Sequence, residues 1–325
     1  MTFDGEEYRS YFPPGEPTNY WTLTADNGAD VLFVDGNFVL TDPTADGSYL
    51  LFDVDDDNTT RLGDLNTVAL SGDLLATNGG SLSLPASTYT IDTLAIATGS
   101  KLLLTGDTNA VNSASGGDAG TPHGEGITIH CETAVVDGLI DGDAAGFREE
   151  GGPGADPGGG DAGGAYGGRG SNPSGSPGAT YGNLTEPTAL GSSGLRTGPG
   201  GPGPGGGALK LVVTNTLTVN GTIRARGTGG NKGSGGSIWL ICDTLASTTN
   251  TASVTALGQY GGTYRASGGG GRVAIDYVNW TYMGSVSVDG GGTGSNRGPA
   301  WSGPLFKQKR LVGGWAGITL DTALS

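Results

Sequence analysis

Clustered carboxylates are the residues in this sequence best suited to chemistry. Asp141, Asp143, Glu149 and Glu150 fall within ten residues of one another. Enzymes that cleave glycosidic bonds use two such groups, one as a general acid and the other as a base or nucleophile. The chain holds 32 Asp and Glu residues, however, so a cluster of this kind is expected by chance. We therefore predict a protein that is not an enzyme and keep polysaccharide cleavage as an alternative.

Nucleophilic catalysis has fewer candidate residues. A Ser–His–Asp or Cys–His site needs a histidine, and the chain contains His123 and His130. His130 precedes Cys131 in an alternating apolar segment. Neighbouring residues of a strand point to opposite faces, so we expect no catalytic dyad between this histidine and the adjacent thiol.

Four aspartates are spaced like the ligands of a calcium-binding loop. Asp53, Asp55, Asp57 and Asp64 match the first, third, fifth and twelfth positions of such a loop. The match is incomplete, because Asn58 stands where the sharp turn has glycine and Asp64 replaces the bidentate glutamate. Calcium is therefore one interpretation of this segment, and a solvated acidic turn is the other. No other cofactor is predicted.

An alternating apolar pattern occurs four times along the chain. The strands that it predicts must position the carboxylates and histidines named above. The segments ITIHCET, LKLVVTN, IWLICDT and VAIDYVN begin at Ile127, Leu209, Ile238 and Val273. Their first, third and fifth residues are apolar or nearly so, whereas the residues between them share no chemistry. Alternation with a period of two predicts strands with one buried face. Its recurrence predicts strands stacked with like positions in register.

Each segment leads to a short strand followed by glycine-rich sequence. These short strands contain Leu139-Ile140, Thr222-Ile223, Val254 and Val286. The first positions are 29 residues apart from Leu209 to Ile238 and 35 apart from Ile238 to Val273, which is within the range of solenoid coils. The predicted fold class is therefore all-β: a parallel β-helix or β-solenoid.

Three regions are expected. Residues 1–79 form a small N-terminal β region that caps the solenoid or attaches the protein, residues 80–303 form the β-solenoid, and residues 304–325 form a C-terminal tail. Gly-containing turns every 8 to 12 residues divide short strands after residue 29. These strands are either a small sandwich or the first coils of the same solenoid.

Three residues of the repeats, two cysteines and a tryptophan, have special predicted surroundings. Cys131 and Cys242 occupy the same repeat position, with Val213 between them. Two coil spacings amount to about 9.6 Å at ~4.8 Å per coil, which is too far for a disulfide, so we expect buried, inert thiols. Trp239 falls at an outward position, where we expect its own loop to cover it; a subunit contact or a sugar is the alternative.

A Gly/Pro-rich insertion, residues 144–207, separates the first repeat from the second. Such a segment cannot bury enough apolar surface to order itself. We expect it to be ordered by packing between extended chains, of the polyproline II kind, or by neighbouring subunits. Its few large side chains are the predicted binding groups: Tyr166, Arg169, Tyr181 and Arg196. The alternative is that they hold the insertion on its own solenoid.

Charge and composition disfavour several classes of partner. The net charge of −16 disfavours nucleic acid, because phosphate binding needs clustered Lys and Arg. No apolar run approaches the roughly 18 residues of a membrane span, and we expect no secretory signal from the first residues. The excess of 24 Asp over 8 Glu favours a saline habitat, although aspartate also suits tight turns.

The repeat sequences LTVNGTIRARGTGG, SGGSIWLI and SGGGGRVAIDY resemble the glycine-rich repeats of phage-type tail fibres and tailspikes and of prokaryotic surface proteins. The resemblance covers about residues 124–290. It implies a parallel β-helix or solenoid that displays loops to a cell surface and is often homotrimeric in fibres. No catalytic residue of these families maps onto the chain.

We therefore predict a structural virion protein at the extracellular surface: a tail fibre, spike or capsid decoration protein. Its expected partners are other copies of itself, other virion proteins and a host-surface glycan or glycoprotein. The expected lack of an export signal favours a virion part assembled inside the host. A cell-surface adhesin or surface-layer component is one alternative, and a polysaccharide depolymerase is another.

Overall fold

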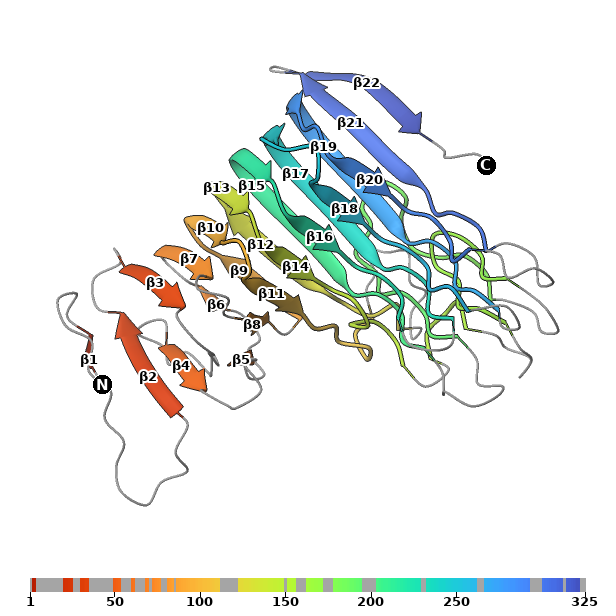
Figure 1. The fold of residues 1–325 in the computed structure, drawn as a ribbon, viewed down its shortest axis with the longest axis horizontal. Coiled ribbons are helices and arrows are strands. Elements are labelled where there is room, and N and C mark those ends of the chain that lie inside the picture. Colours follow the sequence, from red (N-terminus) through yellow and green to blue (C-terminus); the bar gives the residue numbers. More distant parts are fainter. Residues whose placement is uncertain are drawn as a thin grey trace.

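The computed structural model describes residues 86–111, 122–148, 151–155, 162–171, 178–194, 203–228, 232–261, 266–292, 300–311 and 314–321. Within residues 1–84 it describes the strands, with few of their side chains. All the described elements are β-strands, and they form three sheets (Figure 1). Two of these sheets are built mainly of parallel strands, which confirms the predicted all-β class.

The first sheet has twelve described strands, and they pair in parallel except at its C-terminal end. The long strand β15 (Ala208–Val219) pairs with two shorter strands of the preceding repeat, β12 (Ile127–Cys131) and β13 (Thr133–Val136). The other strands of this sheet are β3 (Asp30–Val34), β6 (Val68–Ala69), β7 (Gly72–Ala76), β9 (Thr88–Thr90), β10 (Thr93–Ile96), β17 (Ser237–Ala246), β19 (Arg272–Thr281), β21 (Leu305–Leu311) and β22 (Gly314–Asp321).

The second sheet contains the short strands that the sequence places after each alternating segment. Its seven described strands pair in parallel, each beside the equivalent strand of the next repeat. They are β5 (Thr60–Arg61), β8 (Ser81–Leu84), β11 (Lys101–Leu104), β14 (Leu139–Asp141), β16 (Thr222–Arg224), β18 (Ser253–Thr255) and β20 (Ser285–Ser287).

The predicted register between repeats is confirmed. Ile127 pairs with Leu209, Leu209 with Ile238, and Ile238 with Val273. The column continues to Leu305 on β21. All five side chains are at most 8% exposed, because alternation turns the same position of every strand toward the space between the two sheets.

One hydrophobic core fills that space. Leu211, Leu240 and Ile275 of the first sheet belong to the same buried cluster as Ile223 and Val254 of the second. Cys131 and Cys242 are both buried in it with free thiols, and Val213 lies between them in the register, as predicted.

The parallel sheets extend beyond the predicted limits of 80 and 303 at both ends. Strand β3 pairs with β7, and β7 with β10, so strands before residue 80 belong to the first sheet. A separate three-stranded sheet is formed by β1 (Thr2–Phe3), β2 (Tyr20–Ala25) and β4 (Tyr49–Asp53). At the other end, β21 and β22 extend the first sheet instead of forming a tail, because Leu305 continues the inward column.

Glycine-rich segments between the repeats form a second packed region, which we call the glycine layer. It comprises residues 142–148, 162–171, 189–194, 203–207, 225–228, 233–236, 256–259, 266–271, 288–292 and 300–303. These segments form no strands, yet backbone hydrogen bonds join them: Gly206 N donates to Ser234 O over 2.9 Å and Gly269 N to Gly164 O over 2.9 Å. Figure 1 shows the insertion, in yellow-green, running beside the connections of the later strands. For the described residues of the insertion, the prediction that packing between chain segments holds it in place is confirmed.

Close backbone approach explains why this region needs glycine. A Cβ atom on Gly269 would collide with the carbonyl oxygen of Gly168, and one on Gly206 with the carbonyl oxygen of Ala225. In both cases the obstacle is backbone, which cannot rotate away as a side chain would. The glycines therefore allow the insertion to lie directly against the repeat connections.

Candidate functional site

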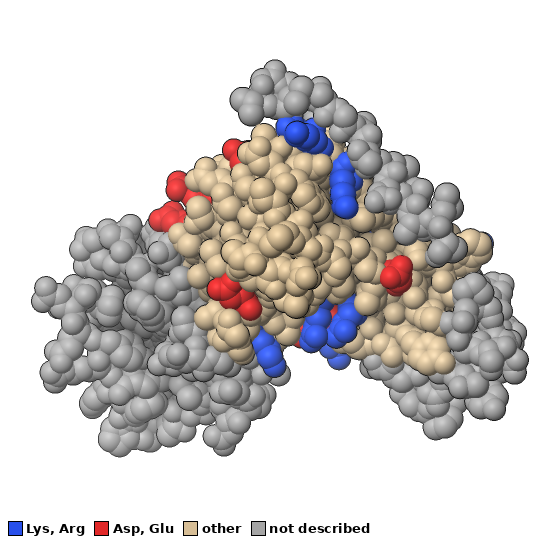
Figure 2. Space-filling model, turned by 45° about the horizontal axis from the view of Figure 1, so that its top comes forward, with Lys and Arg blue, Asp and Glu red and all other residues tan. Residues whose placement is uncertain are grey.

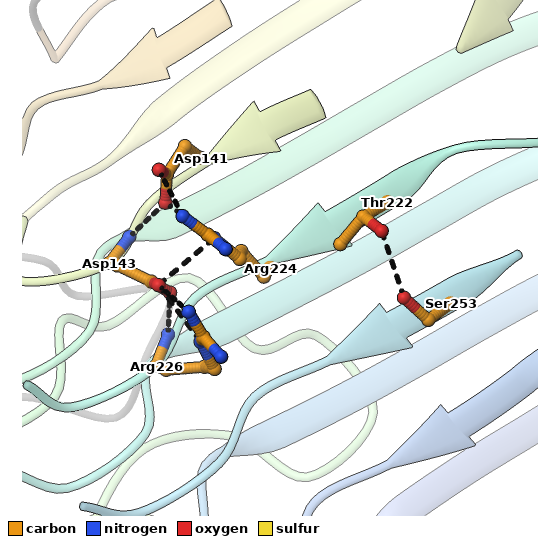
Figure 3. Close-up of polar contacts among 6 residues, drawn as sticks. All are labelled: Asp141, Asp143, Thr222, Arg224, Arg226 and Ser253. Atoms are coloured by element: carbon orange, nitrogen blue, oxygen red, sulfur yellow. Dashed lines mark hydrogen bonds and ion pairs between the residues drawn. The ribbon is translucent and has the colours of Figure 1, made fainter. Parts of the chain in front are cut away.

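Asp141 is the last residue of β14, and Asp143 lies two residues further on, where the chain leaves the second sheet for the glycine layer. Arg224 donates to Asp141 through Nε over 3.0 Å and through Nη2 over 2.7 Å (Figure 3). Arg226 donates to Asp143 through Nε over 2.8 Å and Nη2 over 2.5 Å. Arg224 Nε also lies 2.9 Å from Asp143 Oδ2, so the four side chains form one network.

Strand pairing and main-chain hydrogen bonds also hold this network in place. Strand pairing places Asp141 directly beside Arg224. The main-chain N–H of Arg226 donates to Asp143 Oδ1 over 2.8 Å, and that of Asp143 donates to Asp141 Oδ1 over 3.0 Å. The hydrogen bond from Arg224 to Asp141 raises the pKa of the Arg224 guanidinium above its ordinary value.

This arrangement is that of a structural ion-pair network. A glycosidase needs one carboxyl group that holds a proton and one that is free to attack or to activate water. Asp141 and Asp143 each accept bonds from a guanidinium group instead. The remaining members of the predicted cluster, Glu149 and Glu150, lie outside the described residues.

A groove of about 970 Å³ opens beside the network, between the end of β11 and the base of the insertion. Its wall includes Thr105, Asn109, Asp143, Phe147 and Arg148. Arg148 is exposed and donates to the Ala144 carbonyl over 3.3 Å. The groove therefore combines hydroxyl, amide and charged groups, but its two described aspartates already have arginine partners.

The predicted binding tyrosines are both part of the insertion, and they contact each other and the first sheet. The ring centroids of Tyr166 and Tyr181 are 4.8 Å apart. The Tyr166 hydroxyl lies 2.6 Å from Ser237 Oγ at the start of β17, and the Tyr181 hydroxyl donates to the Leu190 carbonyl. Arg272 donates to the Tyr181 carbonyl over 2.7 Å. Burial raises the pKa of both tyrosines, and Tyr166 is fully buried.

These contacts favour the alternative in which the two tyrosines hold the insertion on the repeats. Each ring fills space between segments that are far apart in the sequence, and each hydroxyl has a partner inside the protein. Arg169, in contrast, is exposed at the edge of the glycine layer. Arg196 lies outside the described residues, as do the side chains of the predicted calcium ligands Asp53, Asp55, Asp57 and Asp64. Calcium binding therefore stays a prediction.

Trp239 lies on the outer face of the first sheet and is only 8% exposed. Lys210 Nζ sits 4.1 Å from the centre of its ring, and its Nε1 donates to Asp276 Oδ2 over 2.9 Å. A pocket of about 230 Å³ beside it is lined also by Glu186 and Thr188 of the insertion. The expectation that the chain itself covers this ring is confirmed. Burial raises the pKa of Asp276.

The arginine partners of the network and the exposed aromatic residues Tyr260 and Trp301 were not predicted from the sequence. The alignment of the short strands already places Ile140 beside Ile223, and one further residue along both strands brings Asp141 beside Arg224. Continuing the alignment of the short strands by one residue would therefore have predicted the pair. Figure 2 shows a face on which the charged side chains of the described residues are few and scattered.

No family model, no curated protein and no solved structure matches this chain. Among the described residues, none belongs to a helix long and apolar enough to cross a membrane. The same part of the chain contains no group of three or more His, Cys, Asp or Glu residues arranged to hold a metal ion.

Proposed function

We propose that this protein is a β-solenoid used as a structural virion part, a tail fibre, spike or capsid decoration protein that displays loops for attachment to a host surface. One observation carries the proposal: a single inward column runs from Ile127 to Leu305 while the insertion is hydrogen-bonded to the repeat connections. A stiff stack with ordered loops on one side suits display of a binding surface.

Stiffness follows from the two kinds of packing. Parallel strands in register bury an apolar core along the stack, and each repeat contacts mainly its neighbours. The glycine layer adds backbone hydrogen bonds between segments as distant in sequence as Gly168 and Gly270, whose N···O distance is 2.8 Å. The displayed loops are therefore tied to a rigid support, which lowers the entropic cost of binding.

The ion pairs of Asp141 and Asp143 support a role without catalysis. Carboxylates committed to Arg224 and Arg226 are poorly placed for proton transfer. The expected partners are further copies of this chain, with a trimer favoured, other virion proteins, and a host glycan or glycoprotein. The acidic composition suits a virus of a saline habitat.

The test is to locate the protein and to compete with it. It should be found in purified virions, and the isolated protein in excess should reduce attachment of those virions to host cells. A heat-unfolded sample is the control. Recovery in the cell envelope instead of virions would identify a cell-surface adhesin. Loss of polymer viscosity on incubation with host polysaccharide would identify a depolymerase.

A further inference from the structure

Trp301 is the most exposed large apolar side chain of the described residues, at 64%, and Tyr260 is 47% exposed. Neither ring contacts another described ring. In contrast, Trp280 packs edge to face against both Tyr277 and Tyr282 at the end of β19. A tryptophan left open to water near the end of a glycine-rich layer has no evident role in folding.

Arg169 lies next to this tryptophan. The main-chain N–H of Trp301 donates to the Arg169 carbonyl over 2.9 Å, so the two residues sit on adjacent segments of the glycine layer. The Arg169 side chain is exposed and forms no ion pair with any described residue. Arg224, Arg226 and Arg310 do form such pairs. On a chain of net charge −16, a guanidinium that forms no ion pair within the described part of the chain can donate to a ligand oxygen.

Polar groups also lie on the segments beside Trp301 and Arg169, and we call this part of the glycine layer its exposed edge. The carboxylate of Asp289, which is exposed, accepts a hydrogen bond from Ser302 Oγ over 3.3 Å, and Ser302 follows Trp301 directly. Gly258 N donates to the Asp289 carbonyl over 2.9 Å, which brings the segment that ends at Tyr260 beside the same strand connection. The edge thus offers two aromatic rings, a cation and a carboxylate on neighbouring segments.

The backbone under these side chains is fixed in advance. Gly270 N donates to the Trp301 carbonyl over 2.9 Å, Gly168 N to the Gly270 carbonyl over 2.8 Å, and Gly303 N to the Val288 carbonyl over 2.8 Å. Little ordering is therefore needed when a ligand binds, and the loss of backbone entropy on binding is small.

The size of the edge argues for a small ligand. Fully exposed aromatic side chains present about 150–250 Å² each, so the two rings together offer roughly 170–280 Å² at their 64% and 47% exposures. A stable protein partner needs about 800 Å² on each side. A few sugar units need much less, and they match an apolar ring face with hydrogen-bonding groups around it.

We propose that Trp301, Tyr260, Arg169 and Asp289 form a saccharide-binding site in which a pyranose ring stacks on Trp301. Arg169 donates to oxygen atoms of the sugar, and Asp289 accepts from its hydroxyl groups. The inference rests on the proposed attachment function and names the chemical class of the receptor for it.

The experiment titrates the full-length protein with neutral hexose, N-acetylhexosamine and uronate oligosaccharides, read by calorimetry. At least one series should bind. Trp301→Ala should weaken that binding at least tenfold, and Arg169→Gln should weaken it about fivefold. Met283→Ala changes an exposed apolar residue elsewhere, at 56% exposure, and should leave binding unchanged. If the protein prefers the uronate series and Arg169→Gln abolishes this preference, the arginine binds a sugar carboxylate. If Arg169→Gln weakens binding equally for every series, the arginine binds hydroxyl groups.

Two results would overturn the inference. One is the absence of binding to all three series by a protein that still blocks virion attachment, which would leave the proposed function in place. The other is saccharide binding that both substitutions leave unchanged. If Trp301→Ala removes attachment while no saccharide binds, the edge recognises a protein and the saccharide assignment is wrong.

Discussion

Asp141 and Arg224 are 83 residues apart in the sequence and form a two-point ion pair, with distances of 3.0 and 2.7 Å between neighbouring strands of the second sheet. The long insertion separates them in the chain, and the stacking of repeats brings them together. The pair also stands where the chain turns out of the sheet, so it locks the start of one glycine-rich connection to the next.

We expect this pair to stabilise the fold measurably. A double-mutant cycle with Asp141→Asn and Arg224→Met should give a coupling free energy of about 1–3 kcal/mol, because the charged hydrogen bonds are two-point and mostly shielded from water. The pair between Asp243 and Arg310 is the control: it is longer, at 3.4 Å, and its aspartate is 56% exposed. Its cycle should give less than about 0.5 kcal/mol. Equal coupling in the two cycles, measured by urea unfolding, would contradict this account.

Leu240 tests the inward core. Its side chain is fully buried in the middle of the stack, so Leu240→Ala should lower the free energy of unfolding by about 2–5 kcal/mol. Met283→Ala, at a position 56% exposed, should change it by less than about 0.5 kcal/mol. Similar effects of the two substitutions on denaturant midpoints would show that the column does not carry the stability assigned to it.

Gly269 and Gly292 form a matched pair for the glycine layer. A Cβ on Gly269 meets the Gly168 backbone, whereas one on Gly292 has the Tyr260 ring at 3.8 Å as its nearest neighbour. We expect Gly269→Ala to lower the unfolding free energy by about 1–3 kcal/mol through backbone displacement. Gly292→Ala should be tolerated. Thermal unfolding of both variants makes the comparison, and an unaffected Gly269→Ala protein would mean that the segments are not packed this closely.

The two thiols predict a loss of stability at alkaline pH. Burial raises the pKa of Cys131 and of Cys242 to about 12, from an ordinary value of 9.0. The pKa of each thiol is higher in the folded protein than in the unfolded one. The free energy of unfolding therefore keeps its full value below pH 9 and falls as the pH rises from about 9 to about 12. Each thiol should make the free energy of unfolding about 1.4 kcal/mol smaller at pH 10 than at pH 8.

The matched protein for this prediction carries Cys131→Val and Cys242→Val, since Val213 fills the same position in the repeat between them. Its unfolding free energy should fall less between pH 8 and pH 10 than that of the unsubstituted protein. The expected difference is about 3 kcal/mol for the two sites. Parallel pH profiles for the two proteins would show that the thiols ionise as readily in the folded state as in the unfolded one.

The strands of the repeats and their register could be predicted from the amino-acid pattern. The alternation in ITIHCET, LKLVVTN, IWLICDT and VAIDYVN states which side chains face inward, because the side-chain period of a strand is a local property. The same pattern placed Val213 between the two cysteines and so separated their thiols. The class of the fold and the column from Ile127 to Val273 could both be predicted in this way.

The arrangement of the glycine-rich segments could not be predicted from the sequence. Glycine carries no side-chain pattern, so nothing in the sequence states that Gly168 lies against Gly270 or that Arg169 lies beside Trp301. The same holds for Tyr166, whose burial depends on Ser237, a residue 71 positions away. The local periodicity of a strand specifies which side chains face the core. Contacts between segments without such periodicity depend on the backbone geometry of the whole glycine layer.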